Sequence, residues 1–205
     1  MEKPLKMCLH CSWQNAVRAV RSTTQKVISN LSTMISILPI KKGGINMGME
    51  DVFNGATSAM TFYDAYLKTV AEEIGMDRAL SLHTKMFETM GTMQGKMIKE
   101  QSGTEEIDTK AAWSLAKSAP ESLGISMEVI DESPQSVVFK VGKCPIYDAA
   151  QMMGVDAETI ENLCRSGPVR FMDAMTKQLN PNFSYKLQRF RSGTDDFCEE
   201  VIVQD

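Results

Sequence analysis

Apolar residues recur every three or four positions along two stretches of the chain, which is the spacing of one helix face. The first stretch spans residues 49–75 and ends at Gly75. The second follows Asp77, which we expect to cap a helix that continues to about Gly103. The expected inner face of this second helix consists of Leu80, His83, Met86, Phe87, Met90, Met93 and Met97. A third helix is predicted within 108–124.

After Gly124 the pattern changes to alternation, which predicts a β-hairpin over 125–141 with its turn at Ser133-Pro134. Short helices are predicted over 144–153, 156–164 and 168–179, and two further strands over 183–190 and 197–203. We therefore expect an α+β fold in which N-terminal helices pack on a mainly antiparallel sheet, in the order helices-ββ-helices-ββ.

Charge divides the 205-residue chain into two parts. Residues 1–46 contain seven basic residues and one acid, whereas 47–205 contain 15 basic and 25 acidic residues. An acidic main body argues against a nucleic-acid partner. We interpret 1–46 as a basic N-terminal extension, disordered or not natively translated, and 47–205 as a single α+β domain.

The sequence before Met47 supports that interpretation. Lys41-Lys42-Gly43-Gly44 is compatible with codons that contain a bacterial or archaeal ribosome-binding site. A natural start at Met47 or Met49 of a prokaryotic protein is the resulting hypothesis. Peptides from 14–40 in the native protein would contradict it.

Composition places the protein in the cytoplasm. Five cysteines without dense spacing are typical of reduced thiols rather than of a disulfide scaffold. The longest uncharged stretch is too short and too polar to cross a membrane, and we see no secretory signal. We expect no membrane partner.

Three cysteines are the candidate reactive groups: Cys144, Cys164 and Cys198. Cys144 precedes Pro145 at a predicted helix start, where free N–H groups and the helix dipole lower a thiol's pKa. Cys164 lies beside Arg165 just before the next helix. Cys198 is expected on one face of a strand with Glu200. Free cysteines also pack as small buried hydrophobes, so each has a purely structural alternative.

His83 is the candidate proton acceptor for such a thiol, since an imidazole can form an ion pair with a thiolate. A hydrogen-bonded core histidine is the structural alternative. We expect no cofactor. Three thiols with His83, or the Cys8-x-x-Cys11 pair, have zinc- or iron-binding residue types, but no spacing typical of a four-ligand site. Asp195 is a candidate for contacting a polar substrate.

Glycine and methionine in the second helix suggest two further features. Gly91 and Gly95 lie one turn apart, which predicts a close approach by another element, either within the chain or in a homo-oligomer. The many methionines suit an adaptable apolar pocket or ordinary core packing.

The segment 144–203 resembles a known family. Cys144-Pro145, Cys164, Leu179-Asn180-Pro181, Gly193 and Cys198 resemble the pattern of the L-2-amino-thiazoline-4-carboxylic acid hydrolases, a family similar in layout to the 4-vinyl reductase domains that bind small hydrophobic molecules.

The resemblance implies hydrolysis of a small cyclic amidine or thiazoline carboxylate through a cysteine thiolate. Cys164 or Cys144 would attack the ring carbon, and His83 would transfer protons. The substrate would contact Cys198, Asn180, Asp195 and a cation, for which Arg170 or Lys143 is available. The alternative is a non-catalytic small-molecule sensor or carrier.

Overall fold

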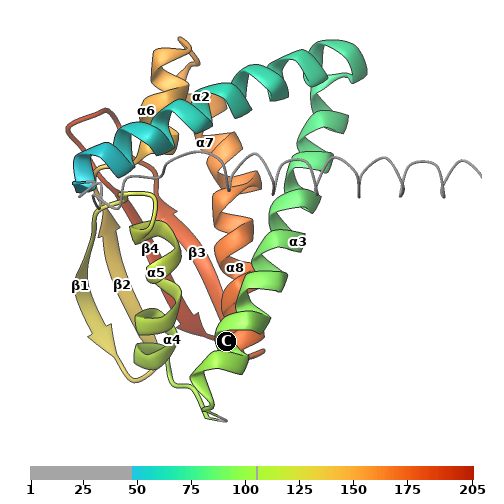
Figure 1. The fold of residues 1–205 in the computed structure, drawn as a ribbon. Helices are drawn as coiled ribbons and strands as arrows, with labels where there is room; N and C mark the ends of the chain where they lie inside the picture. The colour runs from blue at the N-terminus through green and yellow to red at the C-terminus, as the bar shows by residue number, and fades with distance from the viewer. Residues whose placement is uncertain (1–47, 105) are drawn as a thin grey trace, which may run out of the picture. The chain divides into compact units, whose positions relative to one another are not determined.

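The computed structural model describes residues 48–104 and 106–205, so the predicted extension 1–46 lies outside the described residues. The helices are α2 (Met49–Ile74), α3 (Met76–Ser102), α4 (Thr109–Ala116), α5 (Ser118–Glu121), α6 (Pro145–Met152), α7 (Ala157–Ser166) and α8 (Pro168–Leu179). The strands are β1 (Met127–Ser133), β2 (Ser136–Val141), β3 (Phe183–Arg189) and β4 (Cys198–Gln204). They form one antiparallel sheet in the order β1-β2-β4-β3, which confirms the α+β class (Figure 1).

One face of this sheet is buried beneath α4 and α8. Alternate residues of β2 point into the core, and their partners on β4 face the same way: Phe139 pairs with Glu200, and Val141 pairs with Cys198. Trp113 of α4 stacks on Phe139 with the ring centroids 4.2 Å apart. The pairing therefore places Cys198 and Glu200 beneath the helical layer, as the alternation predicts.

The contact between α3 and α8 depends on two glycines. A Cβ atom at Gly91 would lie 2.2 Å from the carbonyl oxygen of Phe171, and one at Gly95 would lie 2.5 Å from that of Met175. Any side chain at either position would collide with the backbone of α8. The predicted close approach is confirmed, and α8 of the same chain makes it.

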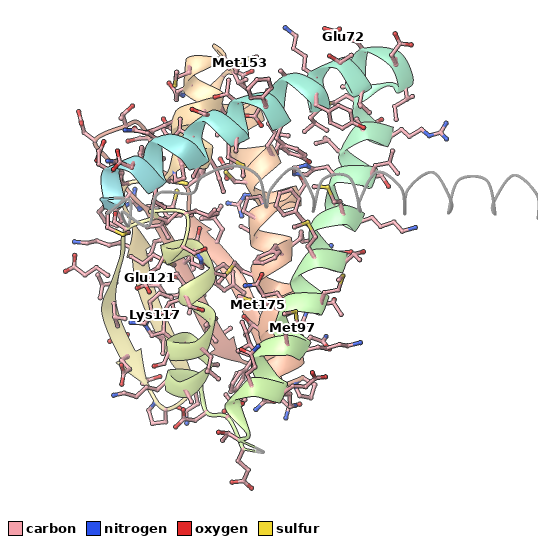
Figure 2. All side chains as sticks on the ribbon, in the orientation of Figure 1. Glu72, Met97, Lys117, Glu121, Met153 and Met175 are labelled. Carbon is pink, nitrogen blue, oxygen red and sulfur yellow. The ribbon has the colours of Figure 1, made fainter. Side chains whose placement is uncertain are left out.

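The expected inner face of α3 is only partly right, because His83 is buried but the methionines are exposed. Its buried residues are Ala79, His83, Gly91 and Gly95, whereas Met86, Met90, Met93 and Met97 are between 37% and 62% exposed. Figure 2 labels Met97 on α3 and the fully buried Met175 on α8. Hydrophobic periodicity treats methionine as a buried position and ignores glycine. However, α8 packs closest to α3 at Gly91 and Gly95, where α3 has no side chain.

Helix termini otherwise follow local capping. Asp108 accepts a hydrogen bond from the Ala111 N–H at 2.7 Å, and Asp156 accepts one from the Thr159 N–H at 2.9 Å. Asp77 is not a cap, because α3 starts at Met76 with Gly75 before it. No helix in the described part of the chain is both long and apolar enough to span a bilayer.

Candidate active site in a cysteine-lined cavity

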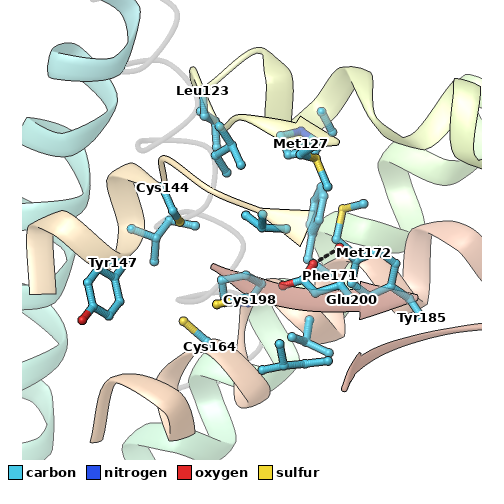
Figure 3. A pocket seen from close by; sticks show the side chains of 18 of the residues that line it. Leu123, Met127, Cys144, Tyr147, Cys164, Phe171, Met172, Tyr185, Cys198 and Glu200 are labelled. Atoms are coloured by element: carbon cyan, nitrogen blue, oxygen red, sulfur yellow. Dashed lines mark hydrogen bonds between the residues drawn. The ribbon is translucent and has the colours of Figure 1, made fainter. Parts of the chain in front are cut away.

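A cavity of about 290 Å³ lies between the helices and the buried sheet face. Most of its wall is apolar, with contributions from Leu123 and Met127 on one side and Phe171 and Met172 of α8 on another (Figure 3). Its size is close to the lower end of the range for small-molecule sites. The cavity can therefore enclose one compact ligand.

The three candidate cysteines all line this cavity. Cys144 comes from the start of α6, Cys164 from the last turn of α7 and Cys198 from the first position of β4. Figure 3 shows the three side chains around the same space. Pairing between β2 and β4 brings Cys198 opposite Val141, three positions before Cys144. The sheet register therefore brings distant thiols together.

Cys144 occupies the predicted place but not the predicted protonation state. It is the N-cap of α6, with Pro145 in the first turn. Burial raises the pKa of its thiol to about 11, and this outweighs the backbone N–H groups of Tyr147 and Ile146, which favour the thiolate. The expected low pKa is wrong because the helix terminus that would lower it is itself enclosed.

Cys164 is likewise a neutral thiol at physiological pH. Burial raises its pKa well above the ordinary value, and negative charge on Cys144, Cys198 or Glu200 would raise it further. Arg165 does not offset this effect, since its guanidinium contacts Glu161 and the carbonyl oxygen of Leu187.

Cys198 differs because a guanidinium group contacts its sulfur. The Nε–H of Arg191 donates to Cys198 Sγ at 3.4 Å. Arg191 is 3% exposed, and its Nη2 also donates to the carbonyl oxygens of Val141, at 2.8 Å, and Gly142. Its guanidinium carbon lies 4.7 Å from the ring centroid of Tyr147. Arg191 therefore holds a buried positive charge in contact with the Cys198 sulfur.

Glu200 supplies the cavity's carboxyl group. Burial raises its pKa to about 7, and the hydrogen bond from Tyr185 and the charge of Arg191 only partly oppose this shift. The Tyr185 hydroxyl donates to Glu200 Oε2, as Figure 3 shows. Burial and the adjacent carboxylate raise the pKa of Tyr185 well above its ordinary value, so its hydroxyl stays protonated. Glu200 can therefore gain or lose a proton near neutral pH.

Comparison with known proteins identifies the family. The family model described as L-2-amino-thiazoline-4-carboxylic acid hydrolase matches residues 55–199. The chain belongs to this family. The match covers most of the described residues, including all the cysteines that line the cavity. A comparison with curated protein sequences finds no match.

Two solved structures are similar in fold. The phenol-responsive sensory domain of the transcription activator PoxR, crystallised with phenol, has a TM-score of 0.50 and 14% identity, covering 71% of this chain and 74% of that chain. A trafficking protein particle complex subunit 3 from Naegleria fowleri, covalently bound to palmitic acid, has a TM-score of 0.49 and 14% identity, covering 74% and 95% respectively. At this identity the PoxR likeness shows the fold alone.

Other predicted site residues lie outside the cavity. His83 is buried, with Nδ1 2.6 Å from the Tyr63 hydroxyl and Nε2 3.2 Å from the carbonyl oxygen of Leu163. Since a carbonyl oxygen only accepts, Nε2 carries the proton and Nδ1 accepts from Tyr63. Gly167 packs directly against this ring. His83 therefore joins α2, α3 and α7 as a hydrogen-bonded core residue.

The predicted polar substrate contacts are also elsewhere. Asn180 donates from Nδ2 to the carbonyl oxygen of Ile107, which fixes the end of α8. Arg170 is exposed and lies 3.3 Å from Glu88, while Lys143 pairs with Glu50 at 2.6 Å. Asp195 is exposed and lines a separate shallow surface hollow. The structure brings none of these side chains into the cavity.

Tyr185 and Arg191 are cavity residues that the sequence interpretation missed. Tyr185 lies on the buried alternation of β3, where its pattern resembles an ordinary core position. Arg191 follows that strand in a polar turn, which is typical of a solvated charge. Glu200 lies on the same strand face as Cys198, as predicted, but nothing in the sequence indicated that its carboxyl would be enclosed in the cavity.

The described ranges, 48–104 and 106–205, contain no candidate metal centre. No three His, Cys, Asp or Glu side chains there come together closely enough to hold one metal ion. The cavity cysteines therefore share a wall without forming a ligand cluster.

Proposed function

We propose that this family member hydrolyses a C–N bond of a small cyclic amidine of the thiazoline type inside the cysteine-lined cavity. The observation that carries the proposal is the convergence of Cys198, Arg191 and Glu200 on one enclosed hollow. Such a hollow provides a nucleophile, a fixed positive charge and a group that titrates near neutral pH, which are the components that thiol catalysis requires.

Cys198 is the proposed nucleophile rather than Cys144 or Cys164. Its sulfur accepts the hydrogen bond from Arg191, whereas burial keeps the other two thiols protonated. The contact with the Arg191 guanidinium distinguishes Cys198 from the other two cysteines. Cys144 and Cys164 shape the cavity wall next to the reacting carbon.

Glu200 is the proposed proton carrier. Its carboxylate accepts the Cys198 proton as sulfur bonds to the amidine carbon and the C=N electron pair moves onto the ring nitrogen. The protonated carboxyl gives that proton to the ring nitrogen. The exocyclic amino group then forms a C=N bond to the same carbon as the ring C–N bond breaks, and the proton that it loses passes through Glu200 to the departing nitrogen, which leaves as an amine. Water next adds to the same carbon through Glu200, and Cys198 leaves as the thiol. One water is consumed and the protein is unchanged.

Turnover of simple amino-thiazolines tests the proposal. Wild type and the Cys198→Ser, Cys144→Ser and Cys164→Ser variants would be assayed with 2-amino-2-thiazoline and with its 4-carboxylate, following ring opening by mass spectrometry. We expect Cys198→Ser to lower kcat/KM by about 100-fold or more and the other two by less. Turnover equal to that of wild type in all three variants would exclude a thiol nucleophile.

A non-catalytic small-molecule-binding domain is the second candidate. It is favoured by the apolar wall and by the raised pKa values of Cys144 and Cys164, which leave two of the three thiols with little thiolate. This function predicts measurable binding of a compact apolar ligand with no ring opening. Calorimetry alongside the turnover assay separates the two functions.

A further inference from the structure

The cavity offers a ligand very little charge. Among the described residues that line it, Glu200 and Arg191 are the only charged side chains. Everything else on the wall is apolar or an uncharged polar group. The ionic character of a ligand that fits is therefore set by these two residues.

Arg191 is already committed to the protein. Its Nε and Nη2 donate to Cys198 and to the carbonyl oxygens of Val141 and Gly142, and Tyr147 lies against its face. At 3% exposure, it has no edge open for the two parallel hydrogen bonds by which arginine binds a carboxylate. A substrate carboxylate could form such a two-bond pair with Arg191 only by displacing interactions that hold β2, β4 and the Arg191 turn together.

The two candidate cations outside the cavity, Lys143 and Arg170, pair with acidic side chains there. Lys143 pairs with Glu50 and lies 3.9 Å from the ring centroid of Phe53, and Arg170 pairs with Glu88 on α3. A carboxylate placed in the cavity would instead meet the carboxyl of Glu200. Taking a second like charge out of water into such a site is unfavourable.

The volume and the wall favour an apolar group. A cavity of about 150 Å³ is enough to hold benzene, and this one is about 290 Å³. The ring of an amino-thiazoline leaves much of it unfilled. The remaining wall includes Leu123, Met127, Phe171 and Met172, which bury hydrocarbon favourably.

We propose that the preferred substrate is a cyclic amidine with an apolar substituent, and without a carboxylate, on the ring. This inference rests on the proposed function and departs from the carboxylate that the family's name implies. Glu200 would accept hydrogen bonds from the amidine nitrogens, while the substituent packs against the α8 side of the wall.

Three probes test the substrate preference: 2-amino-2-thiazolines with a carboxylate, a methyl group or a phenyl group at C4. We expect wild type to prefer phenyl over carboxylate by about tenfold or more in kcat/KM, with methyl between them. Preference for the carboxylate would overturn the inference and leave the proposed hydrolysis intact.

A positive charge introduced into the cavity wall provides a second test of the substrate preference. Leu123→Lys adds a cation to the apolar side, so it should shift the ratio of the phenyl to the carboxylate probe towards carboxylate by about tenfold. Leu123→Met is the neutral control and should leave the ratio unchanged. An unchanged ratio in Leu123→Lys, with circular dichroism showing that it folds, would also overturn the inference.

Absence of turnover is equally informative. If none of the three probes is opened, the proposed hydrolysis fails, and calorimetry then decides only whether the cavity prefers an apolar ligand to a carboxylate. Tighter binding of the phenyl probe than of the carboxylate supports that preference. Tighter binding of the carboxylate, or binding of neither, contradicts it.

Discussion

Burial, rather than local helix geometry, sets the protonation of the cavity's side chains. Pro145 correctly predicts that Cys144 begins a helix, yet enclosure of that helix start raises the thiol pKa. The same enclosure raises the pKa of Glu200. Sequence reveals which residue types stand next to one another, but desolvation depends on packing by residues far along the chain.

Glu200 should make the protein less stable as pH rises. Its folded pKa of about 7 exceeds the ordinary value of 4.5, so the folded state holds the proton more tightly. This stabilisation is complete below about pH 4.5 and is lost as pH rises through about 7, at a cost of about 3 kcal/mol. Urea unfolding of wild type and Glu200→Gln between pH 5 and 8 measures it. Parallel stability curves for the two proteins would contradict the prediction. Asp64→Asn controls for a second, half-buried carboxyl, whose pKa burial raises to about 6.

Arg191 should be important for stability as well as for the thiol. Arg191→Met leaves the carbonyl oxygens of Val141 and Gly142 without their donor inside the protein. We expect the free energy of unfolding to fall by about 2 to 4 kcal/mol. Arg170→Met removes only an exposed ion pair with Glu88 and should cost less than about 1 kcal/mol. Equal effects of the two substitutions would show that the Arg191 contacts are not structural.

At the scale of elements, most helices and strands are predictable because their signals are local. Helices start near Asp108 and Asp156 as expected, and both residues cap them; alternation correctly identifies the hairpin and both final strands. The inner face of α3 is not predictable from hydrophobicity, because α8 packs directly against Gly91 and Gly95, which have no side chain. The glycine spacing was the better signal.

Gly91→Ala should separate α3 from α8. The new methyl group would lie 2.2 Å from the backbone oxygen of Phe171, which no rotamer change relieves. We expect destabilisation of about 1 to 3 kcal/mol. Gly55→Ala is the matched control in α2, with no atom within 4 Å of the added group, and should stabilise by up to about 1 kcal/mol. Thermal unfolding of both variants measures the difference, and a neutral Gly91→Ala would contradict the packing described.

At the scale of the molecule, the cavity depends on long-range pairing. Register between β2 and β4 places Cys198 opposite Val141, while α7 adds Cys164 from above the sheet. Family membership was recognisable from the spacing of the cysteines, since those residues lie within one contiguous segment. The contacts of Arg191 and the position of His83 outside the cavity could not be recognised from the sequence, because both depend on which helices cover the sheet.

Ligand protection of the thiols tests most directly whether one cavity holds them all. Native protein would be alkylated with iodoacetamide in increasing amounts of the best-bound amino-thiazoline probe, and each cysteine followed by mass spectrometry. A shared cavity predicts that alkylation of Cys144, Cys164 and Cys198 slows together, with one half-maximal concentration. Protection of a single cysteine, different half-maximal concentrations, or no protection at all would contradict it.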